Sequence, residues 1–484
     1  MKNEIPFRHA LLPVLFLTLL IVYGLLIRPH WQGQAAIPLE IIFIAASVFT
    51  VALLFILGCD WREIEASIVK KLAGALPAFF ILFAIGLIIS SWMISGAIPM
   101  LVYYGLRIID PAYLYILAFI STIFFSSLTG TSWGSAGTIG VVLTGIAGAL
   151  GAHMGITAGA IIGGAYFGDK MSPLSDTTNL AALASDVTLF DHIRSMMYTT
   201  LPSALLAAGA FFALGFIYPP RVSGAALESL EPFLIALRAM FHFNPLLLLP
   251  PAIVLYGSFR KKATIPVLLL SVLSAALLAL LFQDYSPDSL IQSLYKGFEA
   301  DMAVWMTSIP ENVRVLVGRG GLYALSEPIV IAFMVFIFIG ALDHIRAMPV
   351  VVERLFRFAR GRRSVILTSL AATAFTNALT SNQYATSFII GDAFKAKYDR
   401  YKIPRRVLSR SLEDYGTMIE SLVPWTTTTV FMVATLGVPF ADYWHWQLIS
   451  LINIVIAPLL AWWGIGCFYT PEPEGENRVV RDEL

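Results

Sequence analysis

Charged residues are scarce in this chain of 484 residues, of which 13% are Asp, Glu, Lys or Arg and 58% are hydrophobic. So much apolar surface exceeds what a soluble globular domain can bury. The formal net charge of +1 gives no basic surface, so nucleic acid is not an expected partner. The apolar runs are near spanning length and do not alternate, which predicts an all-α polytopic membrane protein whose partner is the lipid bilayer.

Cysteine and the motifs of enzymes are also sparse. Cys59 and Cys467 are the only cysteines and lie far apart, so the sequence implies no disulfide framework. It carries no zinc-ligand spacing, phosphate-binding loop or catalytic triad, and nothing that indicates ATP hydrolysis. We therefore predict a protein that is not an enzyme and has no cofactor.

The few basic residues are unevenly distributed between the predicted loops. They gather in 60–71, 346–363 and 395–410, which predicts that these loops and both termini are cytoplasmic. Residues 10–27 have full span length and no small-residue cleavage site follows them, so they are interpreted as a retained first span. The sequence thus predicts an integral multi-pass protein of the cell (inner) membrane.

A polar interruption lies in the apolar segment around Pro173, which should break a helix because proline lacks an amide proton. Asp169 and Asp176 flank the break, with several hydroxyl side chains between and after them. Hard oxygen ligands on an interrupted helix at membrane depth favour a site for a small dehydrated cation. The alternative is a polar loop outside the membrane in which Asp176 caps the second helix.

Two further apolar segments, 111–150 and 364–394, each contain a short polar stretch near the middle. The first tip runs from Thr129 to Gly137 and the second from Thr380 to Gln383. We interpret each segment as a re-entrant hairpin, because small polar residues and glycines do not continue a lipid-facing helix. The alternative is a pair of ordinary spans joined by a tight loop.

The two halves align without a gap when 251 is added to the residue number. Pro77 then falls on Pro328, Pro173 on Pro424, and Asp169 on Glu420. Loops beside the first hairpin hold one arginine and no lysine, whereas their counterparts are rich in both, which predicts an inverted repeat with a midplane site. The predicted organisation has five spans and one hairpin per repeat, divided into 1–218 (first repeat, hairpin 111–150, broken helix 157–190), 219–244 (extracellular linker), 245–469 (second repeat, hairpin 364–394, broken helix 408–437) and 470–484 (cytoplasmic tail).

The runs from Gly130 to Thr138 and from Ala165 to Leu180 resemble the NhaC-type sodium/proton antiporter family. In the second half, 408–414 and 436–439 are similar to the same family. The resemblance implies sodium/proton exchange, and the family includes malate/lactate antiporters coupled to sodium and protons. One departure is Glu420, which precedes Pro424 in a stretch where the family pattern has Ser or Thr and then Pro.

The predicted sodium site combines three carboxylates with hydroxyl and amide oxygens: Asp169, Asp176, Glu420, Thr131, Ser132, Ser172, Thr177, Thr380, Ser381, Asn382 and Thr427. Asp169 is expected to bind sodium and a proton alternately, because burial disfavours its charged form and a bound cation restores it. The alternative is that Asp169 only neutralises Lys170. Glu413 and Asp414 are expected to pair with Arg405, Arg406 or Arg410 at the membrane surface.

Three function classes are weighed. A sodium/proton antiporter that moves sodium out by alternating access, with sodium and protons as substrates, ranks first. A sodium- or proton-coupled carrier of a small organic anion or amino acid, of the malate/lactate type, is the alternative. A channel ranks third, because a channel needs a continuous pore and does not need two broken helices closed by hairpins. A homodimer is also an open alternative.

Overall fold

The computed structural model describes residues 6–221, 231–260 and 262–469, except for the side chains of residues 30 and 259. Within these ranges the ordered elements are all helical. The predicted tail 470–484 lies outside the described residues, as do residues 222–230 of the predicted linker 219–244.

Seven helical segments of the described chain are long and apolar enough to cross a membrane. They are α1 with η1 (Phe7–Ile27), α3 (Leu39–Ile56), α4 (Trp61–Ile94), η2 with α6 (Pro111–Thr129), α11 (Leu189–Ile217), α14 (Thr264–Phe282) and α17 (Ser326–His344). Counting two bent pairs raises the number to nine: α12 (Glu231–Met240) with η5 and α13 (Pro245–Ser258), and α24 with η8 (Phe440–Trp446) and α25 (Leu448–Trp463). Eight of the nine coincide with predicted full spans, and Pro111–Thr129 is the first arm of a predicted hairpin.

The segment 60–71 was expected to be a cytoplasmic loop, but it is helical; its cytoplasmic location stays a prediction. α4 begins at Trp61 and continues for 34 residues. The Asp60 carboxylate accepts the backbone N–H of Arg62 at 3.0 Å and caps the helix start. No glycine or proline then interrupts the chain before Gly74, so the helix extends well beyond the apolar segment.

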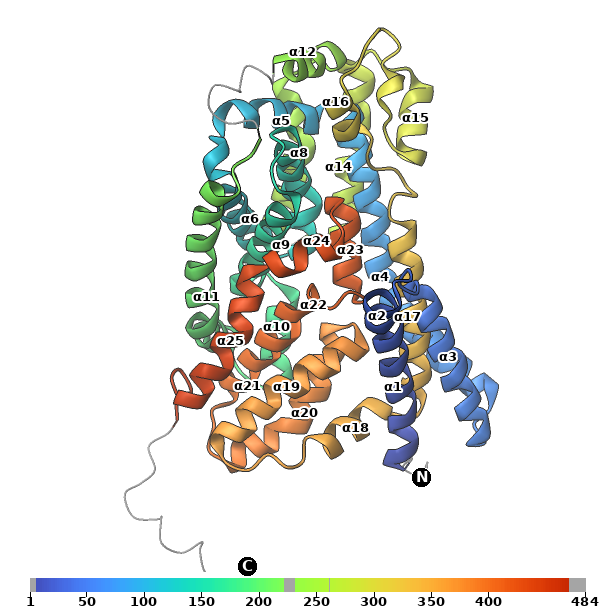
Figure 1. Cartoon of the computed structure of the whole chain (residues 1–484), viewed down its shortest axis with the longest axis vertical. Coiled ribbons are helices and arrows are strands. Elements are labelled where there is room, and N and C mark those ends of the chain that lie inside the picture. The colour runs from blue at the N-terminus through green and yellow to red at the C-terminus, as the bar shows by residue number, and fades with distance from the viewer. Residues whose placement is uncertain (1–5, 222–230, 261, 470–484) are drawn as a thin grey trace, which may run out of the picture.

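The two hairpin segments lie towards opposite ends of the molecule (Figure 1). The first comprises α6 (Leu114–Thr129), α7 (Ser132–Ser135), η3 (Ala136–Gly140) and α8 (Val141–Ala149). The second comprises α19 (Arg362–Thr380) and α20 (Gln383–Arg400). α5 (Ala97–Ile108), α12, α15 (Pro287–Lys296) and α16 (Glu311–Val317) lie near the end of α8, whereas α18 (Ala347–Leu355) lies with α19 and α20.

Both helices that were expected to be broken are interrupted at a proline. α9 (Met154–Met171) and α10 (Asp176–Ala184) are separated by a stretch that contains Pro173. The second comprises α21 (Arg405–Leu412), the π-helical η7 (Glu413–Thr417) and α22 (Met418–Glu420), and after a stretch containing Pro424 it resumes as α23 (Thr427–Leu436). Both breaks lie against the hairpin tips, where polar backbone groups can find protein partners.

Close packing of α9 on α6 depends on small residues. A Cβ at Gly164 would collide with the Phe119 carbonyl oxygen, and one at Gly168 would collide with Ser126 and the backbone of Ser127. The Ser126 hydroxyl donates to the Ala165 carbonyl at 2.6 Å. Glycine four residues apart on one helix face permits this approach, which holds the first hairpin against the first broken helix.

Helix ends recur at the offset of 251 residues. α6 ends at Thr129 and α19 at Thr380, while α10 begins at Asp176 and α23 at Thr427. The residue after each hairpin arm, Gly130 or Ser381, has a left-handed backbone with φ of 67° and 50°. The recurrence extends the sequence repeat to local structure, and the inverted relation of the two halves stays a prediction.

Candidate functional site

A cavity of about 540 Å³ lies where the two hairpin tips meet the two helix breaks. Nine of the eleven residues predicted for the site line it: Asp169, Asp176, Glu420, Thr131, Ser132, Thr177, Ser381, Asn382 and Thr427. Part of its remaining wall comes from α4, α17 and the start of α14, including Pro77, Phe336 and Thr264. The cavity therefore joins residues that are more than 200 positions apart in sequence.

Asp169 is the least satisfied of the cavity carboxylates. Its side chain is 3% exposed, and its Oδ2 accepts the backbone N–H of Ser132 at 3.2 Å. Its Oδ1 is buried and has no hydrogen-bond partner among the described residues. A buried acceptor without a partner is costly, so this oxygen is the natural place for a proton or a cation.

Glu420 is held more completely. Its Oε2 accepts the Thr428 hydroxyl at 2.8 Å, and its Oε1 lies 3.4 Å from the Asn377 amide nitrogen. The Thr429 hydroxyl donates to its carbonyl oxygen at 2.8 Å, which satisfies a backbone group that the broken helix frees. Both carboxylate oxygens of Glu420 thus have protein donors.

Asp176 is exposed and lies in the first turn of α10. It does not cap this helix, as the alternative interpretation had it, because Ser175 accepts the Thr178 N–H at 3.3 Å and is the cap. One carboxylate oxygen of Asp176 accepts the Tyr384 hydroxyl and the other accepts the Thr177 N–H at 2.9 Å. Asp176 is therefore tied to the second hairpin across the cavity.

Two of the predicted tip ligands cap helices. The Thr131 hydroxyl accepts the Gly134 N–H at 3.3 Å at the start of α7, and the Asn382 side-chain oxygen accepts the Ala385 N–H at 2.9 Å at the start of α20. Ser381 accepts the Thr427 N–H at 2.9 Å, joining the tip to α23. Much of the polarity at the tips thus serves the backbone.

Two predicted ligands, Ser172 and Thr380, do not line the cavity. The Ser172 hydroxyl donates to the Ser127 carbonyl at 2.9 Å, and the Thr380 hydroxyl lies 2.9 Å from that of Thr386. Both side chains are buried next to the break or the tip. Their hydrogen bonds connect the first break to α6 and the end of α19 to α20, next to the cavity.

The cavity carboxylates do not converge on one point. Among the described residues, no three His, Cys, Asp or Glu side chains lie close enough together to hold a metal ion. A cation shared by Asp169, Asp176 and Glu420 is thus not supported by this geometry. Hydroxyl and backbone oxygens would have to complete the coordination of an ion at Asp169.

Lys170 is paired, but not with its neighbour Asp169. Its ammonium group is wholly buried and lies 2.9 Å from Oδ1 of Asp414. Asp414 was expected at the membrane surface, and this expectation is wrong because its side chain is only 1% exposed. Of its expected partners, Arg410 does approach it, at 3.9 Å. The alternative that Asp169 only neutralises Lys170 is contradicted.

Several cavity residues were missed by sequence reasoning: Trp133, Gln383, Tyr384, Thr417 and Thr428, with the α4 and α14 residues of the wall. Two signals were available. Thr428 is the counterpart of Thr177 in the repeat, and Pro77 matches Pro328. Tyr384 carried no comparable pattern, because its role depends on how α10 and α20 pack together.

The chain is similar to several known proteins. A model of the Na+/H+ antiporter family matches residues 164–465. An uncharacterized Na+/H+ antiporter of Haemophilus influenzae is 40% identical, with 89% of this chain and 92% of that protein covered. The Na+/H+ antiporter NhaC of Bacillus subtilis is 33% identical, with 91% and 95% covered. The malate-2H+/Na+-lactate antiporter of Bacillus subtilis is 31% identical, with 98% of both covered.

Proposed function

The chain belongs to the Na+/H+ antiporter family, and we propose that it moves sodium out of the cell in exchange for protons by alternating access. The observation that carries the proposal is the state of Asp169. One of its oxygens is fixed by the Ser132 N–H, and the other is buried at the cavity without a partner. Such a group can hold a proton or a cation, and each would exclude the other.

Asp169 supplies the exchange step. In the protonated form it is neutral, which suits a buried carboxyl without a cationic neighbour at contact distance. Sodium entering the cavity favours the carboxylate and displaces the proton. Hydroxyls of Ser132 and Thr177, which line the same cavity, are available to complete the oxygen shell.

Alternating access requires a site between parts that can move relative to each other. The cavity is bounded by the first hairpin and the second broken helix, and Trp133 of the hairpin stacks on Phe431 of α23 with ring centroids 4.4 Å apart. The start of α14, at a turn predicted to be cytoplasmic, also lines the cavity. We propose that the cavity faces the cytoplasm, with both termini on that side of the cell membrane.

Transport by purified protein in liposomes tests the proposal. Vesicles with an internal pH dye and an acidic interior should lose protons when sodium is added outside. Lithium and potassium salts define cation selectivity, and liposomes without protein give the leak rate. Sodium addition that moves no more protons than in empty liposomes, with no sodium taken up, would contradict sodium/proton exchange.

The second candidate is exchange of a small organic anion, such as malate or lactate. Two helix N-termini, those of α10 and α23, lie at the cavity with Thr177, Thr427 and Thr428. Helix N-termini and hydroxyls can bind a carboxylate. The same vesicles loaded with labelled malate, lactate or amino acids decide the matter, because sodium/proton exchange must proceed when these are absent.

A further inference from the structure

Glu413 lies in the interior and has no role in the site described so far. It is the first residue of the π-helical segment η7, and its side chain is 0% exposed. Neither carboxylate oxygen has a hydrogen-bond partner at normal distance among the described residues. A fully buried carboxylate without donors is expensive in a membrane protein and marks a functional group. π-helical segments also occur frequently at functional sites.

The segment that carries Glu413 is connected to the cavity through polar side chains. Thr417 lies one turn after Glu413 at the end of η7 and lines the cavity. The Thr417 hydroxyl is also buried without a hydrogen-bond partner. Gln383, another cavity residue, donates to the Leu412 carbonyl at 2.9 Å and accepts from Asn377 at 2.8 Å. The path from Glu420 through Asn377 and Gln383 therefore ends at Leu412, the residue immediately before Glu413.

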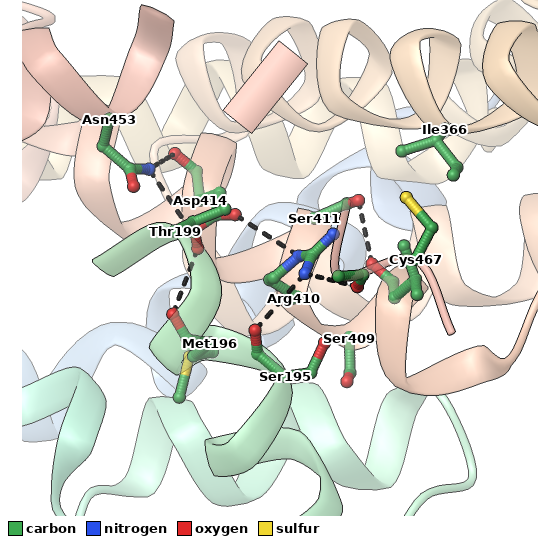
Figure 2. A network of polar contacts seen from close by, with 12 residues as sticks. Ser195, Met196, Thr199, Ile366, Ser409, Arg410, Ser411, Asp414, Asn453 and Cys467 are labelled. Carbon is green, nitrogen blue, oxygen red and sulfur yellow. Dashed lines mark hydrogen bonds and ion pairs between the residues drawn. The ribbon is translucent and has the colours of Figure 1, made fainter. Parts of the chain in front are cut away.

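On its other side, Glu413 adjoins a buried cluster of charge. Asp414 accepts the Lys170 ammonium at 2.9 Å and lies 3.9 Å from Arg410. Figure 2 shows Arg410 between Asp414 and the segment around Cys467, with Thr199 and Asn453 also directed at Asp414. Two buried cations thus share one paired carboxylate, so an ionised Glu413 would balance the second cation.

The charged and titratable groups around Glu413 come from six elements, of which α21 contributes Arg410. Lys170 and Asp169 are on α9, Glu420 is on α22, and Asp414 follows Glu413 directly on η7. α11 contributes His192, which bonds to Ser409 and interacts with Lys170. α19, α20 and α25 contribute the uncharged amides Asn377, Gln383 and Asn453. α10 contributes Asp176, which is held by Tyr384 at the exposed side of the cavity.

We propose that Glu413 is a second proton-binding carboxylate of the exchange cycle, which gives up its proton to the cavity past Thr417 when sodium binds near Asp169. This inference rests on the proposed function. Protonated Glu413 is neutral in its donor-free pocket. One sodium ion takes the place of two protons: the Asp169 carboxylate neutralises the sodium, and the ionised Glu413 balances the second cation of the Lys170 and Arg410 pair, which Asp414 alone leaves uncompensated. Departure of sodium lets a proton return.

Counting the protons that sodium releases tests the inference without transport. Sodium chloride is added to weakly buffered, detergent-purified protein, released protons are read with a pH indicator, and choline chloride is the control salt. In Glu413→Gln the release per protein should fall to about half of that of the unmodified protein, because one of two coupled sites is lost. Glu413→Asp keeps a carboxyl group and should release as many protons as the unmodified protein. Glu353→Gln, an exposed glutamate on α18, is the matched control and should also release the full number.

The outcomes separate the two proposals. If sodium releases no protons from the unmodified protein, sodium/proton competition itself fails. If the unmodified protein releases two protons and Glu413→Gln still releases two, only the role of Glu413 is overturned. A release of one proton by the unmodified protein also overturns it, whether or not the variant folds. A purely structural role would reduce the amount of folded protein and leave the number of protons per folded protein unchanged.

Discussion

The two broken helices have the same backbone arrangement but differ in the hydrogen bonds that their carboxylate accepts. The first segment of each carries an acidic residue in its last turn, Asp169 or Glu420, and the helix resumes after a hydroxyl cap, Ser175 or Thr426. In each, a threonine of the second segment donates to the carbonyl of the acidic residue: Thr178 at 3.3 Å and Thr429 at 2.8 Å. The backbone solution to the break is thus the same in both halves.

The side chains differ. Glu420 has donors at both oxygens, whereas Asp169 keeps one buried oxygen without a partner. Asp169 is followed by a buried cation, Lys170, while Glu420 is followed by Ser421. A repeated fold therefore does not imply two equal ion sites. The open carboxylate is the one suited to exchanging ligands, and the closed one is suited to holding the second hairpin in place.

The largest expected effect is that of Asp169→Asn. The amide cannot bind a proton or provide a charge to sodium, so sodium-driven proton movement should fall to the level of liposomes without protein. Because Lys170 is neutralised by Asp414 and not by Asp169, the variant should still fold and insert.

Asp176→Asn is the matched control for Asp169→Asn. Asp176 is exposed and hydrogen-bonded to Tyr384, so its replacement should leave exchange in operation. Folding of both variants is checked by size-exclusion chromatography in detergent. Exchange by Asp169→Asn at the unmodified rate and pH profile would remove the proposed difference between the two broken helices.

A smaller effect is expected for Glu420→Gln. The amide can still accept from Thr428 but loses the charge, so the cavity should bind sodium more weakly without losing the exchange step. We expect the half-saturating sodium concentration to rise about tenfold, which corresponds to about 1.4 kcal/mol. Sodium titrations of transport in liposomes measure this shift. Complete loss of exchange in folded Glu420→Gln would show that both carboxylates carry the cycle.

The sequence predicted these breaks because proline, paired carboxylates and a fixed offset are all local or repeated signals. It placed Asp169, Glu420 and both hairpin tips together, and the structure brings them to one cavity. It could not foresee which donors reach each carboxylate, because Ser132, Asn377 and Thr428 approach from separate helices. The pairing of Lys170 with Asp414, 244 residues away, was hidden for the same reason.

The irregularities within the broken helices were also only partly predictable from the sequence. Proline marks where a helix must break, but the π-helical segment at Glu413 to Thr417 has no proline or other local signal. The side-chain amide of Gln383 stabilises it by donating a hydrogen bond to the Leu412 carbonyl oxygen. This side chain fits only because residue 416 is glycine, since a Cβ there would collide with the Gln383 amide. Such long-range support of a helix irregularity is a property of the packed structure and not of the segment alone.

Removing the side-chain cap at either hairpin tip should cause a modest loss of stability. Asn382→Ala removes the cap of α20 and Thr131→Ala that of α7, so each should lower the free energy of unfolding by about 1 kcal/mol. Asn382→Asp, which can still cap, should restore the stability. Thermal unfolding in detergent measures this, and parallel sodium titrations show whether either tip also contacts the ion. An unchanged melting temperature in both alanine variants would mean that these bonds are not caps in the membrane protein.

The two turns beyond the hairpins differ in another way. Between α20 and α21, Arg405 makes two bonds to Asp399, at 2.6 and 2.9 Å, and a third to Asp186 at 2.7 Å. The counterpart turn between α8 and α9 makes no such ion pair with the residues that the structure describes. There the Tyr115 hydroxyl accepts the His153 N–H and donates to the Tyr218 carbonyl, each at 3.0 Å. One turn is held by charge at the surface and the other by neutral hydrogen bonds.

The smallest expected effect distinguishes these two turns by pH. Hydrogen bonds from Arg405 hold the pKa of Asp399 below its ordinary value, so the pair stabilises the fold above the unfolded pKa of about 3.9 and this contribution is lost as the pH falls through the lower folded value. Because both side chains are partly exposed, Asp399→Asn should cost less than about 1 kcal/mol at pH 7, and less again in high salt. Tyr115→Phe should cost about 1 kcal/mol at every pH between 4 and 7, because the hydroxyl's partners are the backbone N–H of His153 and the backbone carbonyl of Tyr218, which do not titrate. Melting temperatures of both variants at pH 7 and at progressively lower pH test the contrast. A loss for Asp399→Asn that stays constant down to the lowest pH at which the protein remains folded would show that Asp399 acts through packing and not through its charge.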